Sequence, residues 1–219
     1  MAILVKICGI TTADAADAVV RAGGDFAGLM FHPKSPRNVA PPQAMALAER
    51  MRGRVRLVAV MSDPADEALD AMIRAVKPDL VQLHGAETAQ RVGAIRSRFG
   101  VPVMKVISVA TADDLAGIAA YEDAADLLMF DAKAPAGATR EGGHGTAFDW
   151  QILRGRQFLK PWLLAGGLNA ENVARAICAC EAPGVDVSSG VETAPGKKSP
   201  EMIAAFVSAA RNAQYGAAA

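Results

Sequence analysis

The chain has 219 residues, a length at which an α/β barrel commonly forms one domain. Its 23 basic and 23 acidic residues cancel, and no basic run stands out, so neither nucleic acid nor an anionic membrane is indicated as a partner and a small molecule is expected. No apolar run reaches the roughly 18 residues that span a bilayer, and Lys6 interrupts the apolar start too early for a signal peptide. We therefore expect a cytoplasmic protein.

Short β-rich segments alternate with Ala-rich helical segments along the whole chain. The expected strands are residues 3–8, 26–31, 56–61, 79–83, 103–108, 126–131, 161–165 and 185–188. The expected helices include 12–22, 43–51, 65–76, 87–98, 111–120, 170–180 and 199–213. Strict alternation of strand and helix favours a parallel sheet. Eight units of about 23 to 35 residues predict a single (β/α)8 barrel, a TIM barrel, over residues 1–219, with a short flexible tail from about residue 215.

An open, doubly wound sheet is the alternative architecture. Its dinucleotide-binding form needs G-x-G-x-x-G after the first strand, and this chain has Cys8-Gly9-Ile10-Thr11-Thr12 there, so a Rossmann fold is disfavoured. The two longest units carry their extra residues, 32–42 and 132–148, between a strand and its helix, where barrel loops build the active site. We expect the glycine-containing loop 132–148 to be mobile when empty and ordered by ligand.

Cys8, at the end of the first expected strand, is the first candidate for chemistry. Alternation places Lys6 on the same face, so its ammonium is expected to favour the thiolate, although a cysteine that only packs is the competing interpretation. Asp131 ends the sixth expected strand. In a closed barrel the two side chains would face each other across the mouth, as a base and an acid acting on one substrate do. The competing role for Asp131 is to order its loop.

Glycine clusters late in the chain predict a phosphate site. They are Gly142-Gly143-His144-Gly145-Thr146, Gly166-Gly167 and Ser188-Ser189-Gly190. The last two follow the seventh and eighth strands, where such barrels commonly bind phosphate with backbone N–H groups. Asp186 shares the inward face with Ser188 and is expected to pair with Lys6, with contact to a sugar hydroxyl as the alternative.

Arg37 follows the second strand in Phe31-His32-Pro33-Lys34-Ser35-Pro36-Arg37-Asn38, whose prolines stiffen the loop. Its guanidinium is suited to bidentate binding of a carboxylate, and we expect it on a loop outside the core. A solvated surface arginine is the competing interpretation.

The remaining cysteines and the histidines give no metal site. Cys178 and Cys180 lie two residues apart in an expected helix, which turns their side chains about 200° apart. His32, His84 and His144 are far apart in sequence and form no ligand motif. We therefore expect no metal site and no disulfide framework.

Taken together, these segments resemble the phosphoribosylanthranilate isomerase family of tryptophan biosynthesis, from Lys6 to the last helix. The motifs are Lys6-Ile7-Cys8-Gly9-Ile10-Thr11, Ser35-Pro36-Arg37, Gln82-Leu83-His84-Gly85, Asp131 with Gly142-Gly143-His144-Gly145-Thr146 and Phe148-Asp149-Trp150, Leu164-Ala165-Gly166-Gly167-Leu168, and Gly184-Val185-Asp186-Val187-Ser188-Ser189-Gly190-Val191-Glu192. The resemblance implies a barrel enzyme without cofactor, a monomer or alternatively a homodimer, that performs an Amadori rearrangement of N-(5-phosphoribosyl)anthranilate.

The resemblance also implies roles for single residues. Cys8 matches the general base, Asp131 the general acid, and Arg37 the arginine that holds the anthranilate carboxylate. Substrate-binding positions are expected at His84, Gly143, Gly145, Gly166, Gly167, Asp186, Ser188, Ser189 and Gly190. The chain departs from the family at Gly196-Lys197-Lys198-Ser199, where Gly-x-Lys-Asp is usual, and at Val60-Met61, where Val-Phe is commoner. Ser199 can cap a helix as Asp does.

Other activities fit the residues less well. The related isomerase of the imidazole pathway is expected to use two aspartates, and Cys8 replaces one of them. A Schiff-base aldolase would need a lysine at a strand mouth; Lys133 and Lys105 are candidates, but Lys105 sits mid-strand. A sugar-phosphate-binding barrel without catalysis is disfavoured because both Cys8 and Asp131 are present.

Overall fold

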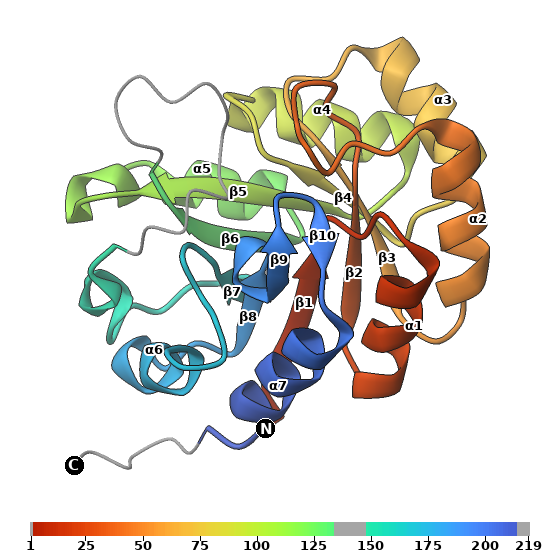
Figure 1. The fold of residues 1–219 in the computed structure, drawn as a ribbon. Helices are drawn as coiled ribbons and strands as arrows, with labels where there is room; N and C mark the ends of the chain where they lie inside the picture. Colours follow the sequence, from red (N-terminus) through yellow and green to blue (C-terminus); the bar gives the residue numbers. More distant parts are fainter. Residues whose placement is uncertain (1, 134–147, 214–219) are drawn as a thin grey trace.

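Eight parallel strands form a closed barrel in chain order in the computed structural model, which describes residues 2–133 and 148–213. The strands are β1 (Leu4–Cys8), β2 (Phe26–Met30), β3 (Arg56–Met61), β4 (Leu80–Leu83), β5 (Val103–Val109), β6 (Leu127–Ala132), β7 (Trp162–Leu164) and β8 (Gly184–Val187). The helices are α1 (Ala13–Ala22), α2 (Pro41–Met51), α3 (Asp66–Val76), α4 (Ala89–Phe99), α5 (Ile118–Ala124), α6 (Val173–Cys180) and α7 (Pro200–Arg211). They surround the strands in Figure 1.

Short elements complete the architecture around the barrel. The described residues include the 3-10 turns η1 (Ala112–Leu115), η2 (Trp150–Leu153) and η3 (Ser189–Val191). A small antiparallel hairpin of β9 (Glu192–Ala194) and β10 (Lys197–Lys198) follows β8 directly. The (β/α)8 barrel predicted from the alternation is confirmed, and most expected strands and helices match to within two or three residues.

The helix expected over residues 111–120 is wrong. Thr111 and Asp114 form a capping box, but it opens only the short turn η1, and Gly117 at φ 78° separates this turn from α5. A left-handed glycine interrupts the helical hydrogen bonds, so the helix starts again at Ile118. The tail expected from residue 215 lies outside the described residues, as does nearly all of the loop 132–148.

The strands bury a separate set of side chains on each face. The barrel interior holds Cys8, Phe26, Val58, Val60, Leu80, Met104, Val106, Met129, Leu163 and Ala165. The other face of the same strands, with Val5, Ile7 and Leu29 among its members, packs against the helices. Alternation along β1 therefore sends Lys6 and Cys8 inward, as predicted, and Lys6 is 0% exposed. A charged group this deep needs a partner.

Three aspartates tie the barrel together at the amino-terminal ends of its strands. Asp25 accepts a hydrogen bond from Val5 N at 2.7 Å, and Asp79 accepts one from Leu57 N at 2.7 Å. Asp126 repeats the arrangement with Val103 N at 2.9 Å. Each carboxylate precedes an even-numbered strand and bonds to the odd-numbered strand before it, so neighbouring units are linked by the same contact.

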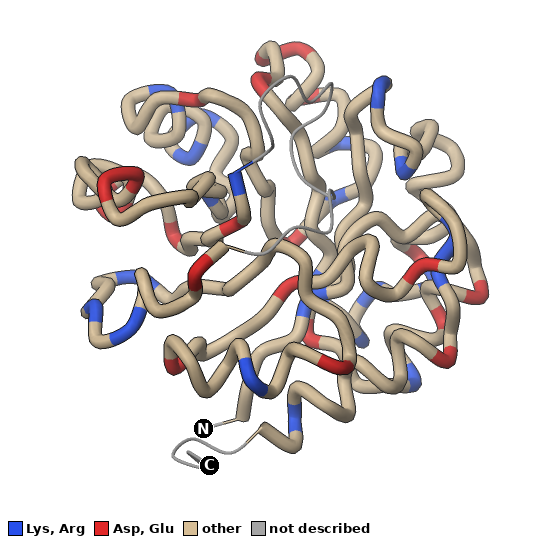
Figure 2. Tube along the Cα trace, turned by 60° about the vertical axis from the view of Figure 1, so that its left-hand side comes forward, with Lys and Arg blue, Asp and Glu red and all other residues tan. Residues whose placement is uncertain are grey.

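The surface carries both signs of charge, and Figure 2 shows Lys and Arg interspersed with Asp and Glu over the visible chain. No helix among the described residues is long and apolar enough to cross a membrane.

Candidate active site

A buried group of polar side chains surrounds Cys8 at the carboxyl end of β1. Lys6 Nζ donates a hydrogen bond to Asp186 Oδ1 at 2.7 Å and also contacts the Cys8 thiol. The ion pair predicted for Lys6 and Asp186 is therefore present. Gly28 makes room for the group, because a Cβ on it would lie 3.0 Å from Cys8 Sγ and 3.4 Å from Lys6 Nζ.

The protonation of Cys8 differs from the sequence-based prediction. Burial raises the pKa of the thiol above its usual value, and Asp186 raises it further, while Lys6 and Lys198 lower it by less. Lys6 thus acts on the pKa of Cys8 in the predicted direction, but burial acts against it and has the larger effect. The pKa of Lys6 is itself raised, because the attraction of Asp186 and Cys8 outweighs the effect of burial.

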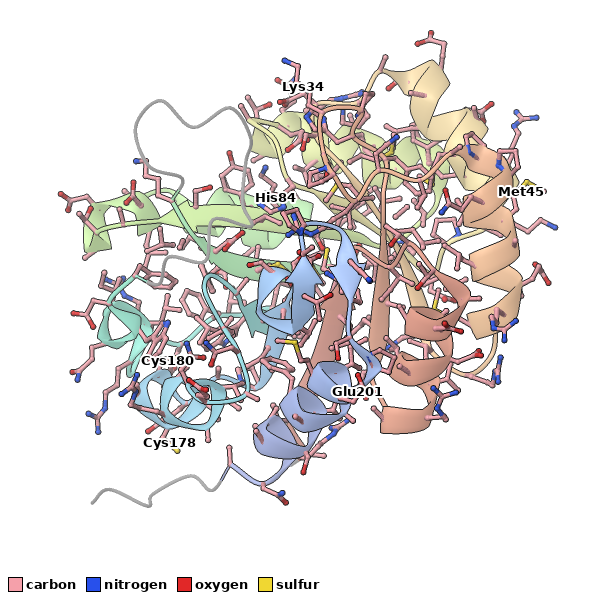
Figure 3. All side chains as sticks on the ribbon, in the orientation of Figure 1. Lys34, Met45, His84, Cys178, Cys180 and Glu201 are labelled. Carbon is pink, nitrogen blue, oxygen red and sulfur yellow. The ribbon has the colours of Figure 1, made fainter. Side chains whose placement is uncertain are left out.

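Asp131 lies across the barrel, near the end of β6, with its side chain directed inward like that of Met129 two residues before it. Its Oδ1 accepts from Ala132 N at 2.8 Å, and its Oδ2 lies 3.3 Å from His84 Nε2. Gln82 Nε2 lies 3.4 Å from the other ring nitrogen of His84. The histidine is therefore held between a buried amide and the carboxylate, and Figure 3 shows it near the middle of the molecule.

Glycines bring the loops after β7 and β8 close to Asp131. Gly166 has φ 92°, and a Cβ there would lie 2.6 Å from Ala132 N and 3.1 Å from Asp131 Oδ1. A Cβ on Gly190 would lie 1.9 Å from Leu168 O, so these two loops touch through backbone. Only glycine permits such an approach.

A cavity brings together Asp131 and half of the predicted substrate-binding residues. It is lined by Asp131, Ala165, Gly166, Gly167, Leu168, Asp186, Val187, Ser188 and Ser189. Ser188 connects this cavity to Cys8, because its Oγ donates to Cys8 O at 3.1 Å. Gly143 and Gly145 lie outside the described residues, so the third glycine cluster is not placed.

Arg37 lies on the loop after β2, as expected, but its side chain is buried and is not the solvated surface arginine of the competing interpretation. It is 5% exposed, and its Nε and Nη2 donate to the two carboxylate oxygens of Glu192 at 2.7 and 2.8 Å. Its side chain lies on Gly9, where a Cβ would come within 2.4 Å of Arg37 Cδ. A bidentate carboxylate contact is therefore present, but with a residue of this chain.

Glu192 and Lys198 are two charged residues near the site that sequence reasoning did not assign. Lys198 Nζ donates to Glu192 Oε1 at 2.6 Å and to Ser188 O at 3.1 Å. The signal for them is the Pro195-Gly196 turn, which predicts a hairpin and thereby brings the opposite charges on either side of it together.

Metal and Schiff-base chemistry find little support in the residues seen. No group of three potential ligands among the described His, Cys, Asp and Glu residues could hold a metal ion. Cys178 and Cys180 lie on α6, away from His84, in Figure 3. Lys105 faces the helices, and its Nζ donates to Glu87 Oε2 at 2.7 Å and to Gly85 O at 2.6 Å, which explains its buried charge without a reacting carbonyl.

Comparison with known proteins decides the family. Residues 5–209 match the family model described as N-(5'-phosphoribosyl)anthranilate (PRA) isomerase. The isomerase of that name from Paramagnetospirillum magneticum is 52% identical over 211 residues, covering 96% of this chain and 98% of the relative. The chain belongs to the N-(5'-phosphoribosyl)anthranilate isomerase family. The match runs from β1 into α7, so it contains both Cys8 and Asp131.

Solved structures of the family have the same fold. The phosphoribosyl anthranilate isomerase of Thermotoga maritima superimposes with a TM-score of 0.85 at 33% identity, covering 95% of this chain and 98% of that one. A phosphoribosyl anthranilate isomerase in complex with reduced 1-(o-carboxyphenylamino)-1-deoxyribulose 5-phosphate gives a TM-score of 0.82 at 33% identity and the same coverage.

Proposed function

We propose that this protein converts N-(5-phosphoribosyl)anthranilate into 1-(2-carboxyphenylamino)-1-deoxyribulose 5-phosphate, in the cytoplasm and without a cofactor, as a step of tryptophan biosynthesis. Family membership over nearly the whole chain carries the proposal. The geometry supports it, because the Cys8 thiol on β1 and the Asp131 carboxylate on β6 lie at the same end of a closed barrel, near a glycine-lined cavity.

The rearrangement needs one proton delivered and one removed. Asp131 protonates the furanose ring oxygen, and the C1–O bond breaks to give a protonated Schiff base. Cys8 then removes the proton from C2, which forms an enolamine. The enolamine takes up a proton at C1 while its C2 hydroxyl becomes the carbonyl of the ketose. No electron leaves or enters the substrate, so acid and base suffice.

The raised pKa of Cys8 fits this order of events. Burial disfavours the charged form of the thiol and thereby raises its pKa. Ring opening places a cationic Schiff base next to C2, and this positive charge favours the thiolate while it also acidifies the C2 proton. Cys8 therefore becomes a base only once a substrate has been opened by the acid.

The remaining predicted residues hold the two ends of the substrate. Backbone N–H groups near Gly166, Gly167, Ser188, Ser189 and Gly190 bind the phosphate, as glycine loops after the last two strands of such barrels commonly do. Gly143 and Gly145 contribute from the other cluster. His84 contacts the substrate next to the acid, Asp186 faces the sugar, and Arg37 binds the anthranilate carboxylate.

We propose that the protein works as a monomer, with a homodimer as the alternative. The large exposed apolar side chains among the described residues are Met45, Leu159 and Met202, which lie on α2, before β7 and on α7. Scattered residues of this kind do not form the continuous patch that a stable interface needs. Sedimentation equilibrium of the purified protein at micromolar concentration decides between the two states.

Complementation tests the activity. The gene should restore growth without tryptophan to a strain that lacks this isomerase, and the purified protein should convert N-(5-phosphoribosyl)anthranilate. Cys178→Ser is a control, since this cysteine lies on α6, and it should complement as the wild type does. Failure of the expressed, folded wild type in both assays contradicts the proposal. Conversion of only the imidazole-pathway substrate would contradict it in favour of the related isomerase.

A further inference from the structure

Three charged side chains meet beside the end of β1 with little access to water. The side chains of Arg37 and Glu192 are 6% and 4% exposed, and that of Lys198 is 0% exposed. Glu192 accepts from both cations, at 2.7 and 2.8 Å from Arg37 and at 2.6 Å from Lys198. We call these three residues the charge cluster.

The charge cluster is one negative charge short. Two cations share a single carboxylate, and burying an uncompensated charge is costly. The pKa values agree with this count: burial and the repulsion of Arg37 lower the pKa of Lys198 despite the attraction of Glu192. The pKa of Glu192 is lowered, because its two cationic partners outweigh the effect of burial. The cluster is thus suited to receive an anion.

The guanidinium of Arg37 still has donors to offer. Arginine carries five N–H groups, and Glu192 takes one on Nε and one on Nη2. Among the described residues no acceptor is hydrogen-bonded to Nη1. The edge formed by Nη1 and Nη2 therefore keeps the paired donors that match a second carboxylate.

Several contacts fix the charge cluster against the catalytic strand. Lys198 Nζ donates to the carbonyl of Ser188 at 3.1 Å and lies 3.3 Å from its hydroxyl, which in turn donates to Cys8 O at 3.1 Å. The turn of the hairpin lies on the loop after β2, since a Cβ on Gly196 would be 2.5 Å from Pro36 O. The hairpin turn therefore packs against the backbone directly before Arg37.

We propose that Glu192 and Lys198 are positioning residues that hold Arg37 with its Nη1–Nη2 edge presented to the substrate, and thereby set the enzyme's preference for a substrate with an aromatic carboxylate. This inference rests on the proposed function. Glu192 binds the Nε–Nη2 edge of the guanidinium and so fixes the orientation of the Arg37 side chain. Lys198 in turn binds Glu192 and keeps its carboxylate in place when a substrate binds. Neither residue touches the reacting atoms.

The test compares two ligands on each variant. One is reduced 1-(o-carboxyphenylamino)-1-deoxyribulose 5-phosphate, and the other is the same compound with phenyl in place of carboxyphenyl. Glu192→Asp keeps the charge but withdraws the carboxylate by one methylene, about 1.5 Å, so a changed affinity reflects position and not net charge. Lys198→Met removes the anchor. Glu49→Asp is the matched control, because Glu49 pairs with Arg52 on the exposed side of α2.

We expect the wild type to bind the carboxylate ligand more tightly. Glu192→Asp and Lys198→Met should each raise the dissociation constant of the carboxylate ligand about 10-fold or more, which is the effect of a displaced charge-assisted pair. The dissociation constant of the phenyl ligand should rise less than about 2-fold. KM should rise in the same proportion while kcat changes little. Glu49→Asp should change neither dissociation constant.

An equal loss of affinity for both ligands would overturn the proposal, because residues that only stabilise the local structure would give that result. Unchanged affinities in both variants would overturn it as well. A wild type that does not distinguish the ligands would overturn it too. If Glu192→Asp does not fold, as judged by thermal unfolding, Lys198→Arg, which also keeps the charge, supplies the same comparison. A wild type that discriminates the ligands but does not isomerise the substrate would contradict the proposed function and leave the charge cluster supported.

Discussion

The two ends of the barrel use the same side chain for different purposes. At the amino-terminal ends of the strands, Asp25, Asp79 and Asp126 each accept a backbone N–H of the neighbouring strand. At the carboxyl ends, Asp131 also accepts a backbone N–H with one oxygen, but its other oxygen faces His84 and the cavity. An aspartate's place along its strand therefore decides whether its carboxylate joins two strands or faces the cavity at the end where such barrels bind their substrates.

The largest expected effect is at the catalytic end. Cys8→Ser keeps the size of the side chain but replaces the thiol with a hydroxyl that does not ionise near neutrality, and Asp131→Asn removes the acid. Each should lower kcat by about 10²- to 10⁴-fold, while the melting temperature stays close to that of the wild type. Steady-state kinetics with the proposed substrate measures this, and Cys178→Ser is the control. Normal kcat in folded Cys8→Ser protein would remove Cys8 from the mechanism.

Gly166→Ala should disturb the same end through the backbone. The added Cβ would lie 2.6 Å from Ala132 N, so the strand that carries Asp131 must shift. A misplaced acid costs on the order of 10²-fold in kcat. Gly155→Ala is the control that separates backbone strain from steric contact of the added Cβ. Gly155 also has a positive φ, at 69°, but nothing lies within 4 Å of its Cβ position. Equal loss of kcat in both variants would refute the collision.

Asp79→Ala, at the amino-terminal end of the barrel, should lower the stability of the protein and leave kcat unchanged. It leaves Leu57 N without its 2.7 Å acceptor, and a hydrogen bond to a charged group is worth about 1.5 to 3 kcal/mol of unfolding free energy. Urea denaturation measures the loss, and kcat of the folded protein should be unchanged. Asp70→Ala removes an exposed carboxylate that pairs with Arg74 and should cost well under 1 kcal/mol. A large fall in kcat for Asp79→Ala would break the division between the two ends.

The smallest effect is on the pH dependence of stability. Because the pKa of Cys8 is raised in the folded protein, the native state holds a proton that the unfolded state loses above about pH 8.5. This contribution is fully present below that pH and is lost as pH rises through the folded pKa. The melting temperature should therefore fall more between about pH 8.5 and 10 for the wild type than for Cys8→Ser. Parallel curves would contradict the raised pKa.

The barrel could be predicted because its signal is local and repeated. In each unit a β-rich run predicts the strand, and composition and capping residues predict the helix. The extra residues of the two longest units, 32–42 and 132–148, follow the carboxyl ends of β2 and β6, as predicted. The helix over 111–120 failed because a real capping box at Thr111 opened only one turn. Gly117 is the residue in the sequence that indicates a break in this helix.

The site was predictable in its positions and less so in its environment. Alternation placed Lys6, Cys8 and Asp186 on inward faces, and their proximity follows from closure. The raised pKa of Cys8 depends on how deeply the thiol is buried, which residue spacing does not give. Likewise, Arg37 meets Glu192 across 155 positions of sequence, so its pairing could not be read from its own loop. The catalytic and binding roles stay predictions.

The pairing of β1 with β8 joins the first segment of the chain to almost the last, and Arg211 at the end of α7 reinforces it by bonding to Ile3 O and to Asp25. During translation, β1 must therefore wait until residues 184–187 have left the ribosome before its second edge is covered. An uncovered strand edge invites pairing with other chains. The neighbourhood of Cys8 forms in the same step, since Asp186 arrives with β8. A nascent chain thus acquires its protection from aggregation and its chemistry together, near the end of synthesis.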